Sequence, residues 1–418
     1  MSELSYLEKL LDGVEVEWKA VGDIAGYSTT KVDADKLDAT SFVGVDNLLA
    51  DKGGRIDATY QPNTARLTAY EPGDILLGNI RPYLKKVWMA ENNGGCSGDV
   101  LAIRILADCK KIISPEYLYY ALSSDSFFSY SMQHAKGAKM PRGSKDAILN
   151  YQIPIPCPSA PGKSLAIQSE IVRILDKFTA LTAELTAELT AELTMRKKQY
   201  NYYRDQLLRF NTEDVPHLPM GQKDIGEFIR GGTFQKKDFM DAGVGCIHYG
   251  QIYTYYGTYI KKTKTHISAT LAKKCKKAQK GNLIIATTSE NDEDVCKAVA
   301  WLGSEDIAVS SDACIYKHNL NPKYVSYFFQ TEQFQNQKRQ YITGAKVRRV
   351  NADNLSKILI PVPSMKEQER IVSILDKFDT LTNSITEGLP REIELRQKQY
   401  EYYRDLLFNF PKPETVSN

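Results

Sequence analysis

The sequence predicts an α+β protein in which two similar globular domains are separated by long antiparallel coiled-coil helices, in a pseudo-two-fold circular arrangement. Three observations predict this class. The chain has 418 residues and is 42% hydrophobic, which is enough for two or three domains with cores of their own. Long segments recur at a fixed offset, which is typical of duplicated architecture. Between the variable stretches lies a leucine-rich segment with helical periodicity.

The repeat has an offset of 200 residues. Ile171-Val-Arg-Ile-Leu-Asp-Lys-Phe178 returns as Ile371-Val-Ser-Ile-Leu-Asp-Lys-Phe378, and the segment that begins Arg196-Lys-Lys-Gln-Tyr200 returns from Arg396. Just upstream, Ile155-Pro-Cys-Pro-Ser159 matches Ile360-Pro-Val-Pro-Ser364, and the prolines there should end a strand before each helix. On this alignment the first half carries five extra residues, Ala160 to Ser164, before its helix.

The stretches between these segments are also related. Gly137-Ala-Lys139 equals Gly344-Ala-Lys346, and Pro115-Glu-Tyr-Leu118 resembles Pro322-Lys-Tyr-Val325. The N-terminal string Tyr6-Leu-Glu-Lys-Leu-Leu11 resembles the helix end Tyr203-Arg-Asp-Gln-Leu-Leu208. A chain that begins with the tail of its own repeat unit predicts a circular arrangement with the two termini near each other.

One long helix is predicted from Gln168 to Leu208. Its centre consists of three copies of Thr-Ala-Glu-Leu, which place Leu181, Leu185, Leu189 and Leu193 along one face. The C-terminal copy, Glu367 to Phe408, is the expected partner, interrupted at Gly388 and Pro390. Each copy adds about 6 Å to a helix, so the segment is expected to act as a spacer, whether or not it is also a simple coiled-coil stalk.

These motifs resemble those of a known family. The signature Gln368-Glu-Arg-Ile-Val-Ser-Ile-Leu-Asp-Lys-Phe378, preceded by Ile-Pro-x-Pro and occurring twice, is similar to that of type I restriction-modification specificity subunits. The central Thr-Ala-Glu-Leu copies resemble the IC class of that family.

The resemblance implies a domain plan. Residues 1–152, with a short N-terminal helix, form the first target-recognition domain, and 153–210 the central repeat with its spacer helix. Residues 211–357 form the second target-recognition domain, 358–410 the C-terminal repeat, and 411–418 a tail. Each recognition domain is expected to read one half of a bipartite, asymmetric site in double-stranded DNA.

The resemblance also implies partners. Two methyltransferase subunits are expected to dock on the helical repeats, and restriction subunits to join them in the full complex. S-adenosylmethionine, ATP and Mg²⁺ are expected on those partner subunits, with no cofactor on this chain and no active site in it.

The residues themselves give no sign of catalysis or of a membrane. Neither a glycine-rich methyl-donor loop nor an Asn/Asp-Pro-Pro-Tyr motif is present, and the five histidines form no metal-ligand pair. The seven cysteines include no C-x-x-C pair, and no apolar run reaches the length of a membrane span. We therefore expect a cytoplasmic, non-catalytic protein with reduced thiols.

Candidate DNA contacts are basic residues in loops. The net charge is only +3, but from Ala242 to Ser289 the chain has eight lysines and no acidic residue. The two Gly-Ala-Lys loops supply further cations, and any single one of these residues has an equally plausible role as a solvated charge. The predicted DNA-binding residues are Arg81, Lys139, Arg142, Lys261, Lys262, Lys264, Lys346, Arg348 and Arg349.

Several alternatives remain open at this point. The tyrosines between Tyr249 and Tyr259 favour a strand followed by a basic loop over a base-stacking platform, and the lysines from Lys273 to Lys280 suit either phosphate contacts or a solvated helix face. A coiled-coil scaffold that binds only protein is the main functional alternative. A self-contained restriction or modification enzyme lacks its motifs, and a complex that only methylates is not distinguished by this sequence.

Overall fold

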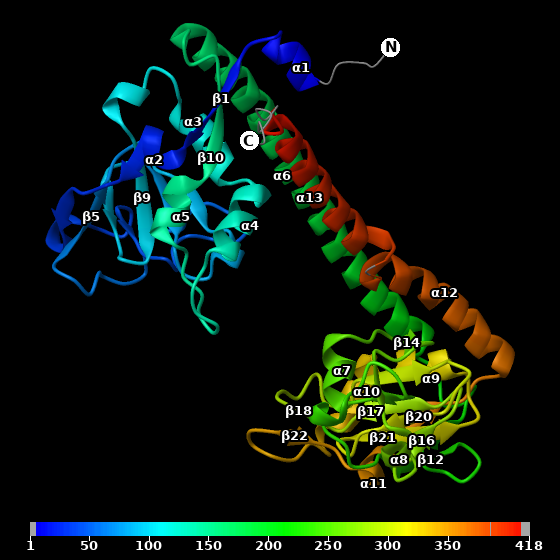
Figure 1. Ribbon diagram of the computed structural model, residues 1–418. Coiled ribbons are helices and arrows are strands. Elements are labelled where there is room, and N and C mark those ends of the chain that lie inside the picture. The colour runs from blue at the N-terminus through cyan, green and yellow to red at the C-terminus, as the bar shows by residue number, and fades with distance from the viewer. Residues whose placement is uncertain (1–5, 385, 411–418) are drawn as a thin grey trace. The chain divides into compact units, whose positions relative to one another are not determined.

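The computed structural model describes residues 6–384 and 386–410, which form two compact units. The first unit consists of residues 6–185 with 395–410, and the second of 186–384 with 386–394. Two long helices, α6 (Pro161–Leu207) and α13 (Gly388–Leu407), contribute residues to both units. Each unit combines β-sheets with helices (Figure 1), which confirms the α+β class.

The first unit contains two four-stranded sheets and a two-stranded ribbon. One sheet is antiparallel, in the order β2-β9-β6-β7, and the other, β3-β5-β8-β4, includes one parallel pair between β4 and β8. Strands β1 and β10 form the ribbon. The strands are β1 (Val16–Ala20), β2 (Ala25–Tyr27), β3 (Lys31–Asp33), β4 (Phe42–Val43), β5 (Arg66–Tyr70), β6 (Ile75–Gly78), β7 (Val87–Met89), β8 (Gly94–Cys96), β9 (Val100–Ile105) and β10 (Gln152–Pro156). The helices are α1 (Tyr6–Leu11), α2 (Val21–Ile24), η1 (Ala34–Lys36), η2 (Pro82–Leu84), η3 (Ala107–Cys109), α3 (Pro115–Leu122), α4 (Asp125–Gln133) and α5 (Lys145–Asn150).

The second unit repeats this plan with additions. Its sheets have the orders β12-β21-β17-β19-β14 and β15-β13-β20-β16, and β11–β23 and β18–β22 form two-stranded ribbons. The strands are β11 (His217–Pro219), β12 (Gly226–Arg230), β13 (Val244–Ile247), β14 (Tyr259–Ile260), β15 (Thr265–Ile267), β16 (Lys277–Ala278), β17 (Leu283–Ala286), β18 (Thr288–Ser289), β19 (Ala298–Trp301), β20 (Ile307–Val309), β21 (Ala313–His318), β22 (Arg348–Arg349) and β23 (Leu359–Pro361). The helices are η4 (Lys236–Asp238), α7 (Tyr249–Thr254), α8 (Ala269–Ala272), α9 (Pro322–Phe328), α10 (Glu332–Arg339), α11 (Ala352–Leu355) and α12 (Met365–Asn383).

The two units share a common scaffold. The antiparallel sheet β2-β9-β6-β7 has the same order and pairing as β12-β21-β17-β19. In the second sheet, β5-β8-β4 corresponds to β16-β20-β13, but the fourth strand is added at opposite edges, β3 beside β5 and β15 beside β13. The predicted duplication is confirmed, and this sheet is where the two domains have diverged most in topology.

Helix starts confirm the correspondence residue by residue. Ser114 and Asn321 cap α3 and α9, and each accepts a hydrogen bond from a backbone N–H of the first turn. Ser124 and Thr331 cap α4 and α10 in the same way. In both pairs the partners lie 207 residues apart, so the globular domains follow an offset of 207 and the long helices one of 200.

The predicted match of the Ile-Pro segments was wrong by two residues. The hydroxyl of Tyr117 donates to the carbonyl of Pro154, and that of Tyr324 donates to Pro361, so Pro154 rather than Pro156 corresponds to Pro361. Four of the five extra residues of the first half, 161–164, belong to the helix, because α6 already begins at Pro161, seven residues before the predicted start. Proline is favourable there because the first helical turn needs no N–H donor from it.

Each unit also contains an antiparallel pair of helices. In the first, the ring of Phe178 on α6 stacks on Tyr403 of α13 with centroids 5.5 Å apart. In the second, Phe378 of α12 stacks on Tyr203 of α6 at 5.8 Å, which is the same contact 200 residues away with the roles exchanged. The core of the first unit includes α1 together with the end of α13, as the circular arrangement predicts.

The C-terminal helix is interrupted as predicted. Helix α12 ends at Asn383 and α13 begins at Gly388. Gly388 has φ +77°, and a Cβ there would lie 2.5 Å from the carbonyl oxygen of Thr380, so only glycine fits. Pro390 lies in the first turn of α13, where the missing N–H costs nothing.

The strand predicted for the tyrosine-rich segment was wrong. Helix α7 begins after His248, whose ring accepts a hydrogen bond from Gly250 N–H, while the Gln251 side chain accepts from His248 N–H. Ile252 and Tyr256 then share one buried face at helical spacing. Of that segment only Tyr259 reaches a strand, β14. The lysines from Lys273 to Lys280 do not form one helix, because α8 ends at Ala272 and β16 begins at Lys277. All of these lysines are exposed, so they do not belong to the core.

Two further observations concern the whole described chain. In residues 6–384 and 386–410, no helix is both long and apolar enough to cross a membrane. All seven cysteines are free thiols, and five of them are buried.

Candidate nucleic-acid interface

The Gly-Ala-Lys loops are the tips of two equivalent hairpins. Lys136 and Arg142 exchange two backbone hydrogen bonds of 2.9 Å, and Thr343 and Arg349 do the same at 2.9 and 2.8 Å. Five residues close each loop, 137–141 and 344–348, and each loop begins with a glycine at positive φ. We call these segments, residues 136–142 and 343–349, the first and second tip hairpins.

Both hairpins are attached to the antiparallel sheet at the same point. Gly143 N–H donates to the carbonyl of Asn79, the residue after β6, at 3.0 Å. Val350 N–H donates to Thr287, the residue after β17, at 3.1 Å. Figure 1 shows the second tip hairpin, with β22, projecting from the sheet beside β18. The sheet therefore holds each base of the hairpin while its tip is solvated.

The first tip hairpin brings together three of the predicted residues, Arg81, Lys139 and Arg142. The N–H of Arg81 donates to the carbonyl of Pro141 at 2.7 Å, and all three side chains are exposed. The guanidinium of Arg142 pairs with the carboxylate of Asp99 at 2.5 Å. Arg81 adopts the left-handed conformation, φ +52°, which is uncommon for a side chain of this size.

The second tip hairpin carries Lys346, Arg348 and Arg349. Arg348 pairs with Asp292 at 2.8 Å and donates to the carbonyl of Gly344 at 2.6 Å. Arg349 lines a cavity of about 290 Å³ together with Arg230, from the end of β12. Sequence reasoning missed Arg230, because a single charge at a strand end carries no distinguishing pattern.

The other three predicted residues lie elsewhere in the second domain. Lys261, Lys262 and Lys264 are exposed in the connection between β14 and β15, and Lys264 lies 4.3 Å above the ring of Tyr255. Strand β14 lies beside α12, because Thr258, the residue before β14, donates a hydrogen bond of 3.1 Å to Asp379 of α12. Strand β22 lies on the opposite side of the domain (Figure 1). The structure does not bring these lysines to the tip hairpin.

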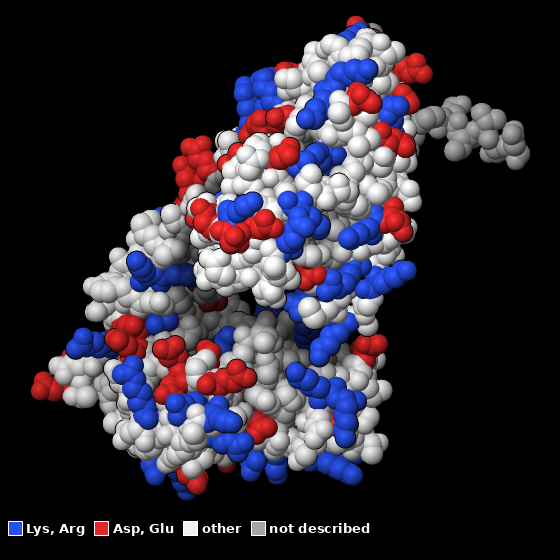
Figure 2. Space-filling model, turned by 90° about the vertical axis from the view of Figure 1, so that its left-hand side faces the viewer, with Lys and Arg blue, Asp and Glu red and all other residues white. Residues whose placement is uncertain are grey.

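Basic and acidic side chains are interspersed on the face shown in Figure 2. This agrees with the net charge of +3. Affinity for a polyanion would therefore depend on local groups of cations such as the tip hairpins, since a broad field of one sign is not seen on that face.

The long helices are attached to the globular domains by repeated polar contacts. Gln168 accepts a hydrogen bond from Ser114 N–H at 3.0 Å, and Gln368 accepts from Asn321 N–H at 2.8 Å. The hydroxyl of Tyr120 donates to Asp176 at 2.6 Å, and Tyr327 donates to Asp376 at 2.7 Å. Both glutamines are buried, so each helix is fixed in rotation against its domain.

The first unit has an additional ionic cluster at this junction. Asp125 accepts hydrogen bonds from Lys52 at 3.0 Å and from Lys85 at 2.8 Å. Buried Arg404 of α13 contacts Asp125 and Glu401, and Lys52 also reaches Glu401 at 2.6 Å. Burial raises the pKa of the Asp125 carboxyl, but the hydrogen bonds from Lys85 and Lys52 outweigh it and hold this pKa below its usual value.

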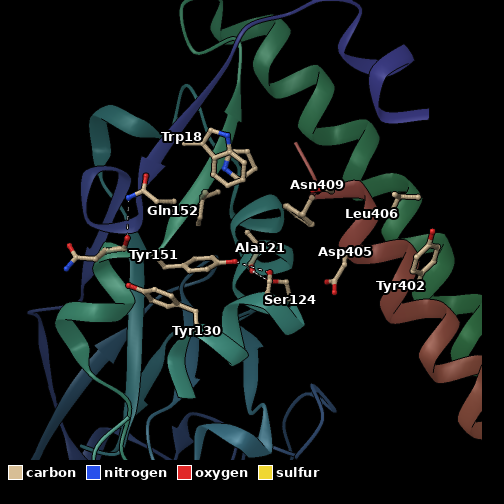
Figure 3. A pocket seen from close by; sticks show the side chains of 15 residues that line it. Trp18, Ala121, Ser124, Tyr130, Tyr151, Gln152, Tyr402, Asp405, Leu406 and Asn409 are labelled. Atoms are coloured by element: carbon tan, nitrogen blue, oxygen red, sulfur yellow. Dashed lines mark hydrogen bonds between the residues drawn. The ribbon is translucent and has the colours of Figure 1, made fainter. Parts of the chain in front are cut away.

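A cavity lies beside the end of α13 in the first unit. It has a volume of about 830 Å³. Figure 3 shows Trp18, Tyr130 and Tyr151 on one side and Tyr402 with Leu406 of α13 on the other. Tyr402 is 64% exposed, and its equivalent on α6, Tyr202, is 61% exposed. Large aromatic side chains left open at the same position of both repeats are typical of a surface for a protein partner.

Among the residues described, no group of three or more His, Cys, Asp or Glu side chains is arranged to hold a metal ion.

A family model described as the type I restriction modification DNA specificity domain matches twice, at residues 72–195 and 219–395. The EcoR124I/EcoR124II specificity subunit of Escherichia coli is 40% identical over 430 residues, covering 100% of both chains. The putative type I specificity subunit S.HindORF215P of Haemophilus influenzae is 33% identical, covering 97% of this chain and 98% of the relative.

Two solved structures have a similar fold. A chain from a study of complex assembly and conformational transition of the type I R-M system superposes with a TM-score of 0.65 at 17% identity, covering 94% of this chain and 97% of that one. The HsdS subunit of Thermoanaerobacter tengcongensis gives a TM-score of 0.50 at 16% identity, covering 94% and 96%.

Proposed function

The chain belongs to the family of type I restriction-modification DNA specificity subunits, and from this premise we propose that its two tip hairpins are the elements that read DNA. The subunit recognises a DNA sequence within a type I complex and does not itself catalyse a reaction. Its partners are double-stranded DNA and the methyltransferase and restriction subunits of that complex.

The division of labour within the chain follows the repeats in the sequence. Residues 1–152 and 211–357 are the two target-recognition domains, and the repeats 153–210 and 358–410 carry the helices on which two methyltransferase subunits dock. S-adenosylmethionine, ATP and Mg²⁺ belong to the partner subunits. Free thiols throughout the chain suit a reducing cytoplasm. The Thr-Ala-Glu-Leu copies support the proposal that the subunit is of the IC class.

The equivalence of the two hairpins is the observation that carries the proposal. Both are closed by the same backbone pair, attached to the same point of the sheet and tipped with Ala-Lys, although the surrounding domains have diverged. Base reading needs donors on a rigid support, and Arg81 and Arg142 in one domain and Arg348 and Arg349 in the other meet that need. A scaffold that binds only protein would have no use for two such hairpins.

Methylation of a DNA library tests this function. The chain alone should transfer no methyl group, and the chain with its methyltransferase should methylate adenine at a gapped, two-part sequence. Replacing Lys346 by alanine should weaken binding to all sequences alike and reduce the salt slope by about one, because it removes a phosphate contact. If methylation occurs without any sequence preference, the hairpins do not read DNA.

The exposed tyrosines of the helices support a docking surface for the methyltransferase. The partner would cover Tyr402 and the neighbouring cavity in the first unit, and Tyr202 in the second. Tyr402→Ala should lower co-purification of the methyltransferase several-fold, whereas Tyr255→Ala, at a tyrosine that is 54% exposed in a recognition domain, should leave it unchanged. Equal effects of the two variants would place the docking surface elsewhere.

A further inference from the structure

Each hairpin tip carries an exposed apolar side chain. Met140 is 51% exposed in the first tip hairpin and Val347 is 45% exposed in the second. The two residues lie 207 positions apart, which is the offset of the globular domains, so they occupy the same place in the repeated fold. One exposed apolar residue needs no explanation, but its return at the same place in two domains that have otherwise diverged indicates a shared use.

The surroundings of these side chains exclude a role in the core. Lys139 precedes Met140 and Lys346 precedes Val347, and both lysines are exposed. An ion pair with a carboxylate holds an arginine near the end of each loop. In the first tip hairpin, Asp99 pairs with Arg142. In the second, Arg348 is held by its ion pair at 2.8 Å and by the Gly344 carbonyl. Each tip is therefore an apolar group set between cations on a backbone held at both ends.

The shape of the hairpin selects the groove. A two-stranded ribbon fits the major groove, which is about 12 Å wide, and is too broad for the minor groove of about 6 Å. The phosphates on either side would meet the flanking lysine, and the nearby arginines would donate to base edges. The apolar tip would then face the base edges, where the methyl group at C5 of thymine is the apolar feature of the major groove.

We propose that Met140 and Val347 are specificity-determining residues, each of which contacts a thymine methyl group in one half-site. The inference rests on the proposed function and deepens it, because it assigns base discrimination to an uncharged side chain at a defined position. It also assigns one half-site to each hairpin. Lys139 and Lys346 supply affinity without sequence preference.

The test is a double-substitution cycle on protein and DNA. The complete complex of specificity and methyltransferase subunits is first used to select its sequence from randomised duplexes. Each thymine of the two half-sites is then replaced in turn by deoxyuridine, which lacks only the methyl group. Binding of the wild type, Met140→Ala, Val347→Ala and Lys139→Ala is measured on every duplex and at several salt concentrations.

For the wild type, replacing one particular thymine of each half-site by deoxyuridine should lower the affinity about fivefold to tenfold. This is the lower end of the range for the loss of one base contact. Met140→Ala should abolish the effect of deoxyuridine in one half-site only, and Val347→Ala in the other only, with an unchanged salt slope. Lys139→Ala should preserve both deoxyuridine effects and lower the slope. Because both tip residues are exposed, alanine there should leave the fold intact, which hydrogen exchange would verify.

Two results would overturn the inference. One is an equal deoxyuridine effect in the wild type and in both tip variants at every thymine, which would mean that the tips do not contact the methyl groups. The other is a half-site selected without any A·T pair. Absence of a gapped sequence for the wild type would instead refute the proposed function, so the two failures are distinguishable.

Discussion

Asp125 holds the first recognition domain to the C-terminal helix, and removing its charge should loosen that attachment. Its carboxylate accepts hydrogen bonds from Lys52 and Lys85 and also contacts Arg404. Asp125→Asn preserves the shape of the side chain but leaves Lys52, Lys85 and Arg404 with one carboxylate fewer. Hydrogen bonds to charged groups contribute about 1.5–3 kcal/mol each, and Asp125 is 31% exposed, so we expect a loss of about 2–3 kcal/mol in total.

Hydrogen exchange measured by mass spectrometry is the appropriate assay, because it reports the opening of each helix separately in a protein of two units. A loss of about 2–3 kcal/mol corresponds to exchange that is roughly 30- to 150-fold faster in α4 and the end of α13. The matched control is Glu332→Gln in α10, at the corresponding position of the second domain. Glu332 is exposed, and the contact found there uses its backbone N–H, which donates to Asp205 at 3.2 Å.

The control variant should change exchange in α10 by less than about threefold, as for an ordinary surface substitution. If Asp125→Asn and Glu332→Gln accelerate exchange equally, the ionic cluster adds nothing to the attachment. If neither does, the contacts of Asp125 are exposed ion pairs of negligible strength. Either result would refute this account of the junction.

Three further predictions concern the spacer, acidity and the hairpin turn. Deleting residues 186–189 shortens α6 by about 6 Å at 1.5 Å per residue, so the unspecified part of the DNA site should shrink by one or two base pairs. Sequencing of methylated sites should show both half-sites unchanged, and altered half-sites would contradict the spacer role. Burial lowers the pKa of His318 to about 4, so stability should be lost as the pH falls from 6.5 towards 4, by at most about 3 kcal/mol. His318→Phe should flatten this dependence in thermal denaturation, and an unchanged pH profile would exclude His318 as the cause. Gly344→Ala should weaken binding to one half-site, because its Cβ would lie 2.1 Å from the carbonyl oxygen of Val347. The control Gly281→Ala has the same φ of +92° but no atom within 4 Å of its Cβ, so it should leave binding unchanged. Equal binding by the two variants would show that the turn does not matter.

The duplicated helices could be predicted from the sequence because their residues nearly repeat as strings. Because of that identity, either of the two contacts, Phe178 with Tyr403 or Phe378 with Tyr203, predicts the other. The break at Gly388 was also predictable, since it depends on the local backbone preference of one residue.

Features that depend on distant residues could not be predicted. The tyrosine segment forms a helix because His248 caps it and Tyr253 donates to the distant carbonyl of Thr288, which alternation of aromatic residues does not reveal. The cluster around Asp125 joins residues more than 270 positions apart in the chain. Arg230 reaches the second tip hairpin only through the pairing of strands.

Selection from a randomised duplex pool at moderate salt tests the central claim most directly, with the chain co-purified with its methyltransferase subunit. The account predicts a two-part consensus with a fixed unspecified gap, one part for each tip hairpin. Retention that depends on salt but yields no consensus would contradict it, because the hairpins would then bind phosphate without reading bases, and the chain would serve as a scaffold.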